Sequence, residues 1–404
     1  MPTKNSKLNQ TLLGTAILVR AVGLGLYMRH TIEPARLNEI SRGSVTQLKV
    51  PQGFNVEHYA DVPAARQMSL SDSGILFVGA KIGDRIRAVM PPTAGGKPRV
   101  VDLVGFKDPN GVACLGRDLY VGEIPRIVRV DDVQAKLEAL PAGATELAVQ
   151  PAVHADGLPP EGHHGWKYIR FSPQGELFTA QGMPCNVCEK SDLIYGTILR
   201  LGKDKKWEVY ASGVRNSVGF DWRSPGDLWF TDNGRDWLGD DLPPDELNHA
   251  PKPGLNFGFP YRYGDNVPDP EYGGKPKAAK LAASFVVPAQ KLDAHVASLG
   301  MRFCKSPAFP PEYRDSVFIA EHGSWNRSKP SGYRITQVDL SGDKPVYKPF
   351  ITGFQNADGS PWGRPVDLIF GPAGEMYISD DHAGAIYKVT YNGLDKAKST
   401  DYQK

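Results

Sequence analysis

The chain has 404 residues, enough to bury the core of one large domain or of two ordinary ones. Its 47 basic and 45 acidic residues nearly cancel, and no basic block follows the pattern of a phosphate-binding surface, so we expect no nucleic-acid partner. The 43 glycines and 34 prolines favour many short strands joined by tight turns.

The first thirty residues differ in character from the rest of the chain. Two lysines lie within residues 1–10, and residues 11–28 are apolar apart from Arg20. A basic segment followed by an apolar one is typical of an export signal or of an uncleaved anchor. We therefore predict an apolar N-terminal helix (1–30), a linker (31–45) and a periplasmic or other extracytoplasmic location. Cleavage and membrane attachment through residues 11–28 both stay open, as does a buried helix or a disordered tail.

A repeated pattern runs through residues 46–392. In each copy a short apolar strand, a glycine-containing turn and a second apolar strand follow one another, in most copies with a third strand behind them. The copies lie at 70–89, 114–130, 169–201, 220–230, 301–320 and 368–389. One such unit cannot bury its own faces, so several must stack around an axis. The predicted fold is an all-β, six-bladed β-propeller with a tail at 393–404, and residues 49–60 are expected to close the ring on the last blade.

Long excursions interrupt this repeat, at residues 134–166, 182–194, 232–292 and 323–332. Loops of such length in a compact domain usually carry function. On a propeller they would gather over one mouth of the central channel and form the wall of a pocket.

Two of the four cysteines, Cys185 and Cys188, form a CxxC in the second excursion. No histidine follows them, so covalent haem attachment is not indicated, and no second CxxC is present to complete a structural zinc site. In an oxidising compartment we predict a local disulfide here, with a redox-active pair as the alternative.

Polar clusters lie where the predicted blade strands meet the excursions. Their sequences are GHHGWK (162–167), GVRNSVGF (213–220), TDNGRD (231–236) leading to DELN (245–248), and WGRPVD (362–367). In these clusters the chain resembles the PQQ-dependent glucose/sorbosone dehydrogenase family, propellers that hold pyrroloquinoline quinone (PQQ) over the channel mouth with calcium beneath it. A single GxRN would be a weak signal, whereas these elements in order on a six-fold repeat are specific.

The resemblance covers residues 46–392, and residues 321–327 (EHGSWNR) together with the CxxC suggest the sorbosone or pyranose dehydrogenase-like branch. It implies a quinoprotein oxidoreductase that transfers hydride from a sugar or sugar-derived aldehyde to PQQ. It also implies Ca²⁺ as a second cofactor and an external cytochrome or quinone as the electron acceptor.

Carried over position by position, the resemblance makes His163 the general base, because it lies four residues before the basic Lys167, and leaves His164 as the alternative. An imidazole, whose pKa is near 7, suits the removal of a hydroxyl proton. Arg215 and Asn216 match the pair that bonds the quinone oxygens, where a cation would stabilise developing negative charge.

The resemblance also assigns the remaining cofactor ligands. The main-chain carbonyls of Gly234 and Arg235 match the calcium ligands, and Asp232 and Asp236 are further candidates unless they belong to a solvated turn. Arg364 matches an arginine that pairs with a cofactor carboxylate.

One stretch departs from the family pattern. Relatives place a lysine near the quinone at the end of a fifth-blade strand, and residues 320–327 hold none. Arg327 or His322 is the expected substitute, and Trp325 is expected to stack on cofactor or sugar unless it belongs to the core. His295 is a further candidate for the mouth.

Two other functions are compatible with a propeller. A calcium-dependent hydrolase of the lactonase or esterase type would use carboxylate and amide ligands spread over several blades. A non-catalytic ligand-binding propeller would have no use for a base, a fixed cation and a metal loop. No glycine-rich dinucleotide motif follows a strand and opens a helix, so NAD and FAD are not expected.

Overall fold

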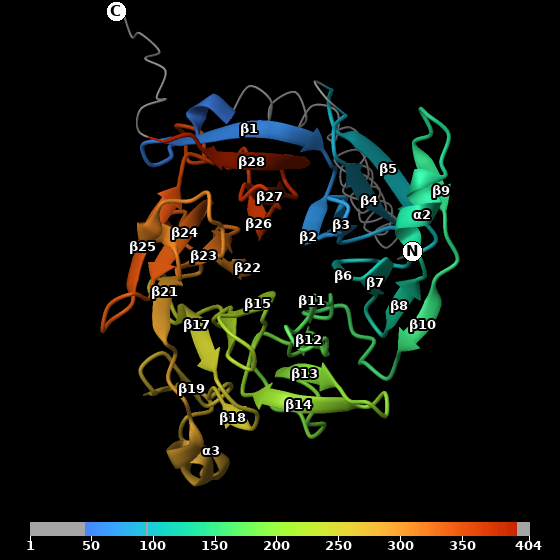
Figure 1. Cartoon of the computed structure of the whole chain (residues 1–404). Helices are drawn as coiled ribbons and strands as arrows, with labels where there is room; N and C mark the ends of the chain where they lie inside the picture. Colours follow the sequence, from blue (N-terminus) through green and yellow to red (C-terminus); the bar gives the residue numbers. More distant parts are fainter. Residues whose placement is uncertain (1–44, 94–95, 394–404) are drawn as a thin grey trace, which may run out of the picture.

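Each repeat of the sequence forms an antiparallel hairpin, because its strands are short and apolar and a glycine makes the turn between them. Gly74 and Gly175 make two of these turns with φ of 82° and 80°, a conformation that other residues resist. In the computed structural model, which describes residues 45–93 and 96–393, six such units stand around one axis (Figure 1). The predicted six-bladed β-propeller is confirmed.

From the axis outward, blade 1 contains β2 (Ala65–Leu70), β3 (Leu76–Ala80), β4 (Arg85–Met90), β5 (Arg99–Val104) and β9 (Glu146–Ala148). Blade 2 contains β6 (Gly111–Leu115), β7 (Asp118–Gly122), β8 (Ile127–Val130) and β10 (Ala152–Ala155). Blade 3 contains β11 (Ile169–Phe171), β12 (Leu177–Gln181), β13 (Thr197–Leu201), β14 (Trp207–Ser212) and β18 (Leu255–Asn256).

In the same order, blade 4 contains β15 (Gly219–Trp222), β16 (Leu228–Asp232), β17 (Pro244–Ala250) and β21 (Gln290–Ala294). Blade 5 contains β22 (Ser298–Phe303), β23 (Val317–Glu321), β24 (Arg334–Asp339) and β25 (Val346–Ile351). Blade 6 contains β26 (Pro365–Phe370), β27 (Met376–Asp380), β28 (Ala385–Tyr391) and β1 (Phe54–Asp61). The outermost strand of blade 6 is thus the first strand of the chain. It pairs antiparallel with β28, Phe54 opposite Tyr391, which confirms the predicted closure of the ring.

The excursions contain more regular structure than the sequence indicated. The first holds most of helix α2 (Val133–Glu138) and the outer strands β9 and β10. The third holds β17, most of β21, the hairpin β19 (Arg262–Tyr263) and β20 (Val267–Pro268), helix α3 (Pro276–Leu281) and a 3-10 turn, η2 (Ala282–Ser284). Two further 3-10 turns are η1 (Val45–Gln47) and η3 (Pro311–Tyr313). The short outer strands β9 and β10 are mostly exposed, so apolar alternation does not mark them.

Apolar side chains pack between neighbouring blades, and charged ones meet at the centre of the ring. Arg302 on β22 is buried; its guanidinium donates to the Met301 carbonyl at 2.8 Å and to the Tyr168 hydroxyl, and pairs with Asp367 on β26 at 3.4 Å. The Asp367 carboxylate also accepts the main-chain N–H of Met68 on β2 at 2.8 Å. These contacts join the innermost strands of different blades across the axis.

The predicted signal or anchor (1–30) and nearly all of the linker and of the tail lie outside the described residues. Within the part of the chain that the structure describes, no helix is both long enough and apolar enough to cross a bilayer.

Candidate active site

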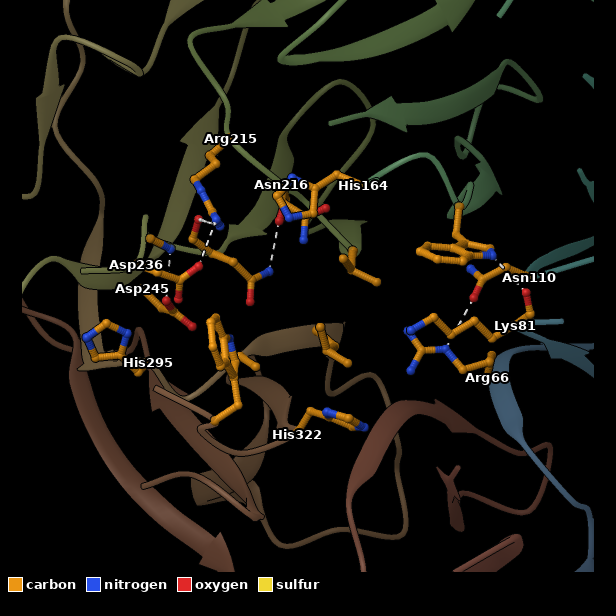
Figure 2. A pocket seen from close by; sticks show the side chains of 17 residues that line it. Arg66, Lys81, Asn110, His164, Arg215, Asn216, Asp236, Asp245, His295 and His322 are labelled. Carbon is orange, nitrogen blue, oxygen red and sulfur yellow. Dashed lines mark hydrogen bonds and ion pairs between the residues drawn. The ribbon is translucent and has the colours of Figure 1, made fainter. Parts of the chain in front are cut away.

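A cavity of about 310 Å³ opens at one mouth of the ring (Figure 2). In each antiparallel hairpin the start of the inner strand lies beside the end of the second strand, so the residues at these positions from all blades share one face of the propeller. Blades 1 to 5 and the loops between them supply the lining that matters here: Arg66, Lys81, Asn110, His164, Trp166, Arg215, Asn216, Gly234, Asp236, Asp245, His295, His322 and Trp325.

His164 is held in one tautomer on the cavity wall. Its Nδ1 lies 2.7 Å from the Met183 carbonyl, and a carbonyl can only accept, so Nδ1 carries the proton and Nε2 is the unprotonated nitrogen of the neutral ring. The residue has φ of 52°. Gly182 permits the close approach, since a Cβ there would come within 2.6 Å of the His164 Cβ.

The structure places His163 differently. Its side chain is exposed and does not belong to the cavity lining, although its ring centre is 4.1 Å from that of His164. Lys167, the basic residue that selected His163, is fully buried at the start of the blade and does not line the cavity. Of the two adjacent histidines, the alternative His164 therefore occupies the position predicted for the base.

We expect His164 to stay neutral far below the usual titration range of a histidine. Burial, followed by the positive charges of Arg215 and His163, lowers the pKa of His164 to about 3. A group with a lowered pKa takes up its proton only at lower pH, so the ring should protonate as the pH falls towards 3. An NMR titration of the imidazole Hε1 resonance checks this, and a midpoint near the ordinary value of about 6.5 would contradict it.

Arg215 and Asn216 reach the same cavity, as predicted. The Arg215 guanidinium is buried and donates to the Asn186 main-chain oxygen at 2.8 Å, to the Asn186 side-chain oxygen at 3.0 Å and to the Asn233 carbonyl at 3.2 Å. It also pairs with Asp236 at 3.3 Å. The side-chain amide of Asn216 makes no hydrogen bond with any residue that the structure describes, so it is available to a ligand.

The predicted metal residues separate into two groups. The carbonyls of Gly234 and Arg235 accept no hydrogen bond within the described ranges, and Gly234 lines the cavity. The Asp232 carboxylate is buried and accepts the main-chain N–H groups of Arg215 and Asn216 at 2.8 and 2.6 Å, so it is not part of a solvated turn and holds the loop.

Among residues 45–93 and 96–393, no group of three His, Cys, Asp or Glu side chains is placed to hold a metal ion. Burial raises the pKa of Asp232 to about 7.

Of the three other predicted cofactor residues, Arg364, Arg327 and Trp325, only the last lines the cavity. The Arg364 guanidinium does not line the cavity but donates to the carbonyls of His322 and Gly323 at 3.0 and 2.7 Å. Arg327 also lies off the lining and pairs with Asp241 at 2.8 Å. Trp325 does line it and is 67% exposed, so the alternative that it belongs to the core is wrong.

Arg66 and Lys81 form a cationic corner of the cavity that no motif in the sequence had indicated (Figure 2). The Lys81 ammonium lies 4.6 Å from the centre of the Trp166 ring and makes no ion pair with any described residue. Burial, then the charge of Arg66, lowers its pKa. Arg66 lies near the start of the inner strand of blade 1 and Lys81 follows its second strand, as Arg215 and Gly234 do in blade 4. Their places in the repeat could therefore have identified them as cavity residues.

A partly buried chain of polar contacts connects this corner to the fifth blade. Arg66 donates to Asn110 at 3.2 Å and pairs with Asp381 at 2.7 Å, and the other Asp381 oxygen lies 2.8 Å from Nε2 of His322. Although burial raises it, the charges of His322 and Arg66 bring the pKa of Asp381 below its usual range. His295, the remaining predicted mouth residue, lines the cavity and contacts the Gly239 carbonyl at 2.8 Å.

Comparisons with known proteins agree with this architecture. An uncharacterized protein of Borreliella burgdorferi is 35% identical over 362 residues, which cover 86% of this chain and 92% of that protein. A family model described as TrAA12-like matches residues 262–392, which hold blade 5, three of the four strands of blade 6 and the region from β19 that precedes them.

Three solved structures share the fold over 85% of this chain. The first is the calcium structure of a Trichoderma reesei family AA12 carbohydrate-active enzyme, with 97% of that chain covered, 19% identity and a TM-score of 0.70. The second is the holo form of the PQQ domain of pyranose dehydrogenase from Coprinopsis cinerea, with 97% of that chain covered, 18% identity and a TM-score of 0.68. The third is the PQQ-bound aldose sugar dehydrogenase from Streptomyces coelicolor, with 99% of that chain covered, 20% identity and a TM-score of 0.56. The chain therefore belongs to the same family as the Borreliella burgdorferi protein, and its residues 262–392 match the TrAA12-like family model. Its fold is the six-bladed propeller that the resemblance to the PQQ-dependent glucose/sorbosone dehydrogenases predicted.

Proposed function

We propose that this protein is a quinoprotein oxidoreductase that oxidises a sugar or a sugar-derived aldehyde with bound PQQ. The observation that carries the proposal is one cavity in which the unprotonated nitrogen of His164 lies with the buried cation of Arg215 and the unpaired amide of Asn216. Two of the similar structures are of a pyranose dehydrogenase and an aldose sugar dehydrogenase with PQQ, which supports the assignment.

The charges of the cavity suit an anionic, planar cofactor. PQQ carries three carboxylates besides its quinone, and the lining supplies Arg66, Lys81 and Arg215, of which Lys81 has no ionic partner among the described residues. We assign the quinone oxygens to Arg215 and Asn216, and the carboxylates to the Arg66 and Lys81 corner rather than to Arg364. When bound, PQQ supplies the acceptor for the hydride that leaves the substrate carbon.

His164 would act as the base. Its Nε2 accepts the proton of the substrate hydroxyl, and the Met183 carbonyl keeps the ring in the tautomer that allows this. Trp325 is exposed at the mouth and offers an aromatic face to the sugar.

Calcium fits the loop through oxygen donors of the main chain. The Gly234 and Arg235 carbonyls are without hydrogen-bond donors among the described residues, and carbonyls are ordinary calcium ligands. The ion would supply a fixed positive charge beside the quinone site. Asp232 is not assigned to it, because both of its oxygens bond main-chain N–H groups, and Asp236 is engaged by Arg215.

Reconstitution tests the proposal. Protein treated with a chelator should bind PQQ weakly, and added Ca²⁺ should restore both binding and dye reduction with at least one member of a panel of aldoses and sugar-derived aldehydes. PQQ binding that survives complete chelation would remove the metal assignment. Bound PQQ without oxidation of any panel member would contradict the proposed reaction, and lactone hydrolysis measured in parallel would favour the hydrolase.

The proposal extends to location and partners. The Cys185–Cys188 disulfide is formed, and such bonds persist in oxidising compartments. We place the protein outside the cytoplasm, with an external cytochrome or quinone as electron acceptor, and fractionation of cells that express the full chain tests the location.

A further inference from the structure

The CxxC loop contacts the cavity wall of the neighbouring blade. Cys185 and Cys188 are joined by a disulfide with their Cα atoms 6.2 Å apart, in the loop between β12 and β13 of blade 3. Asn186 lies inside this small covalent ring. It is half-buried, and its partners belong to blade 4.

Asn186 makes four hydrogen bonds with two residues of the cavity. Its main-chain oxygen accepts from Arg215 Nε at 2.8 Å, and its side-chain oxygen accepts from Arg215 Nη2 at 3.0 Å and from the Asp236 main-chain N–H at 2.8 Å. Its side-chain nitrogen donates to the Asp236 carbonyl at 3.2 Å. One residue therefore sets the position of the buried cation and of the loop that follows Gly234 and Arg235.

The other partners of the Arg215 guanidinium are more distant than Asn186. The guanidinium reaches the Asn233 carbonyl at 3.2 Å and the Asp236 carboxylate at 3.3 Å, both on the same loop. Because that loop is itself bonded to Asn186, loss of Asn186 would loosen the cation and its remaining partners together.

We propose that Asn186, held in place by the Cys185–Cys188 disulfide, is a positioning residue that fixes Arg215 and residues 234–236 for cofactor binding. This inference rests on the proposed function. A covalent link that restricts a loop before binding removes part of the ordering cost that binding would otherwise carry. Reduction by a dithiol breaks the S–S bond, adds two electrons and two protons to give two thiols, and converts the reductant to its cyclic disulfide.

The test combines Asn186→Ala with Cys185→Ser/Cys188→Ser and with the triple variant. PQQ affinity is measured by fluorescence titration in Ca²⁺, and Leu193→Ala is the matched control, because Leu193 lies in the same loop and is 77% exposed. We expect Asn186→Ala to weaken PQQ binding about 10-fold, the effect of losing a hydrogen bond to a charged group. Removal or dithiol reduction of the disulfide should weaken binding in the same direction, and the triple variant should bind no more weakly than Asn186→Ala.

A purely structural role of the loop would not produce this non-additivity. Unchanged affinity in Asn186→Ala, or independent and additive effects of the two changes, would overturn the inference. A second measurement needs no cofactor: the Asp236 amide, which donates to Asn186, should exchange its hydrogen faster in Asn186→Ala and in the cysteine variant. If the unaltered protein fails to bind PQQ, the proposed function fails, and this exchange experiment alone decides whether Asn186 holds the loop.

Discussion

Replacement of His164 by Gln should slow substrate oxidation by the reconstituted protein by about 10²- to 10⁴-fold, the usual contribution of a positioned base. The Gln side chain can still donate to the Met183 carbonyl, but it has no nitrogen that accepts a proton. PQQ affinity should change little, because the cofactor contacts proposed above belong to Arg215, Asn216, Lys81 and Arg66. Single-turnover rates and PQQ titration of the same preparation separate the two effects.

His163→Gln is the matched control, since it alters the adjacent imidazole outside the cavity lining. Its rate should stay within a few-fold of the unaltered protein. A large loss in His163→Gln with a small one in His164→Gln would return the role to His163. Near-normal rates in both variants would refute imidazole base catalysis at this site.

Arg302→Met should lower the free energy of unfolding by about 3–5 kcal/mol, the usual cost of leaving one member of a buried ion pair without its partner. The substitution leaves the buried Asp367 without its cation and the buried Tyr168 hydroxyl without its donor. Burial already raises the pKa of Asp367, and Arg302 opposes that effect. Urea denaturation monitored by tryptophan fluorescence measures the loss.

Two variants test the cause. Arg302→Met combined with Asp367→Asn should recover part of the stability, because no uncompensated charge remains at the centre. Arg117→Met removes an arginine whose pair with Asp132, at 2.6 Å, is more than half exposed, and it should hardly shift the denaturation midpoint. Equal losses in Arg302→Met and Arg117→Met would contradict the role given to the central ion pair.

The sequence predicted the inner part of each blade well and the outer part poorly. Strands such as β3 and β12 are buried along their whole length, and each follows a turn glycine. Their apolar pattern can therefore be recognised in the sequence. The outer strand β9 pairs with β5 in parallel, and two of its three residues are exposed. β9 forms only because β5, more than forty residues earlier in the chain, provides its hydrogen-bonding partners, and a local sequence pattern cannot predict such a pairing.

Within the site, the residue types were predicted more reliably than their orientations. Arg215 and Asn216 line the cavity as expected, whereas the base position moved by one residue. Spacing along a strand cannot anticipate the positive φ of His164, which turns this residue rather than His163 to the cavity. Motif matching failed at Arg364 for a similar reason, because its guanidinium donates to main-chain carbonyls of the preceding blade.

The strand that completes the ring, β1, carries one further consequence. It pairs with β28, so the seam joins residues 54–61 to residues 385–391. A nascent chain therefore remains an open arc until the ribosome has made its last strand, and its terminal blades keep unpaired edges during that time. Contacts between such distant segments form slowly, and unpaired strand edges are sites of aggregation. Truncation of either seam strand would make that vulnerable state permanent.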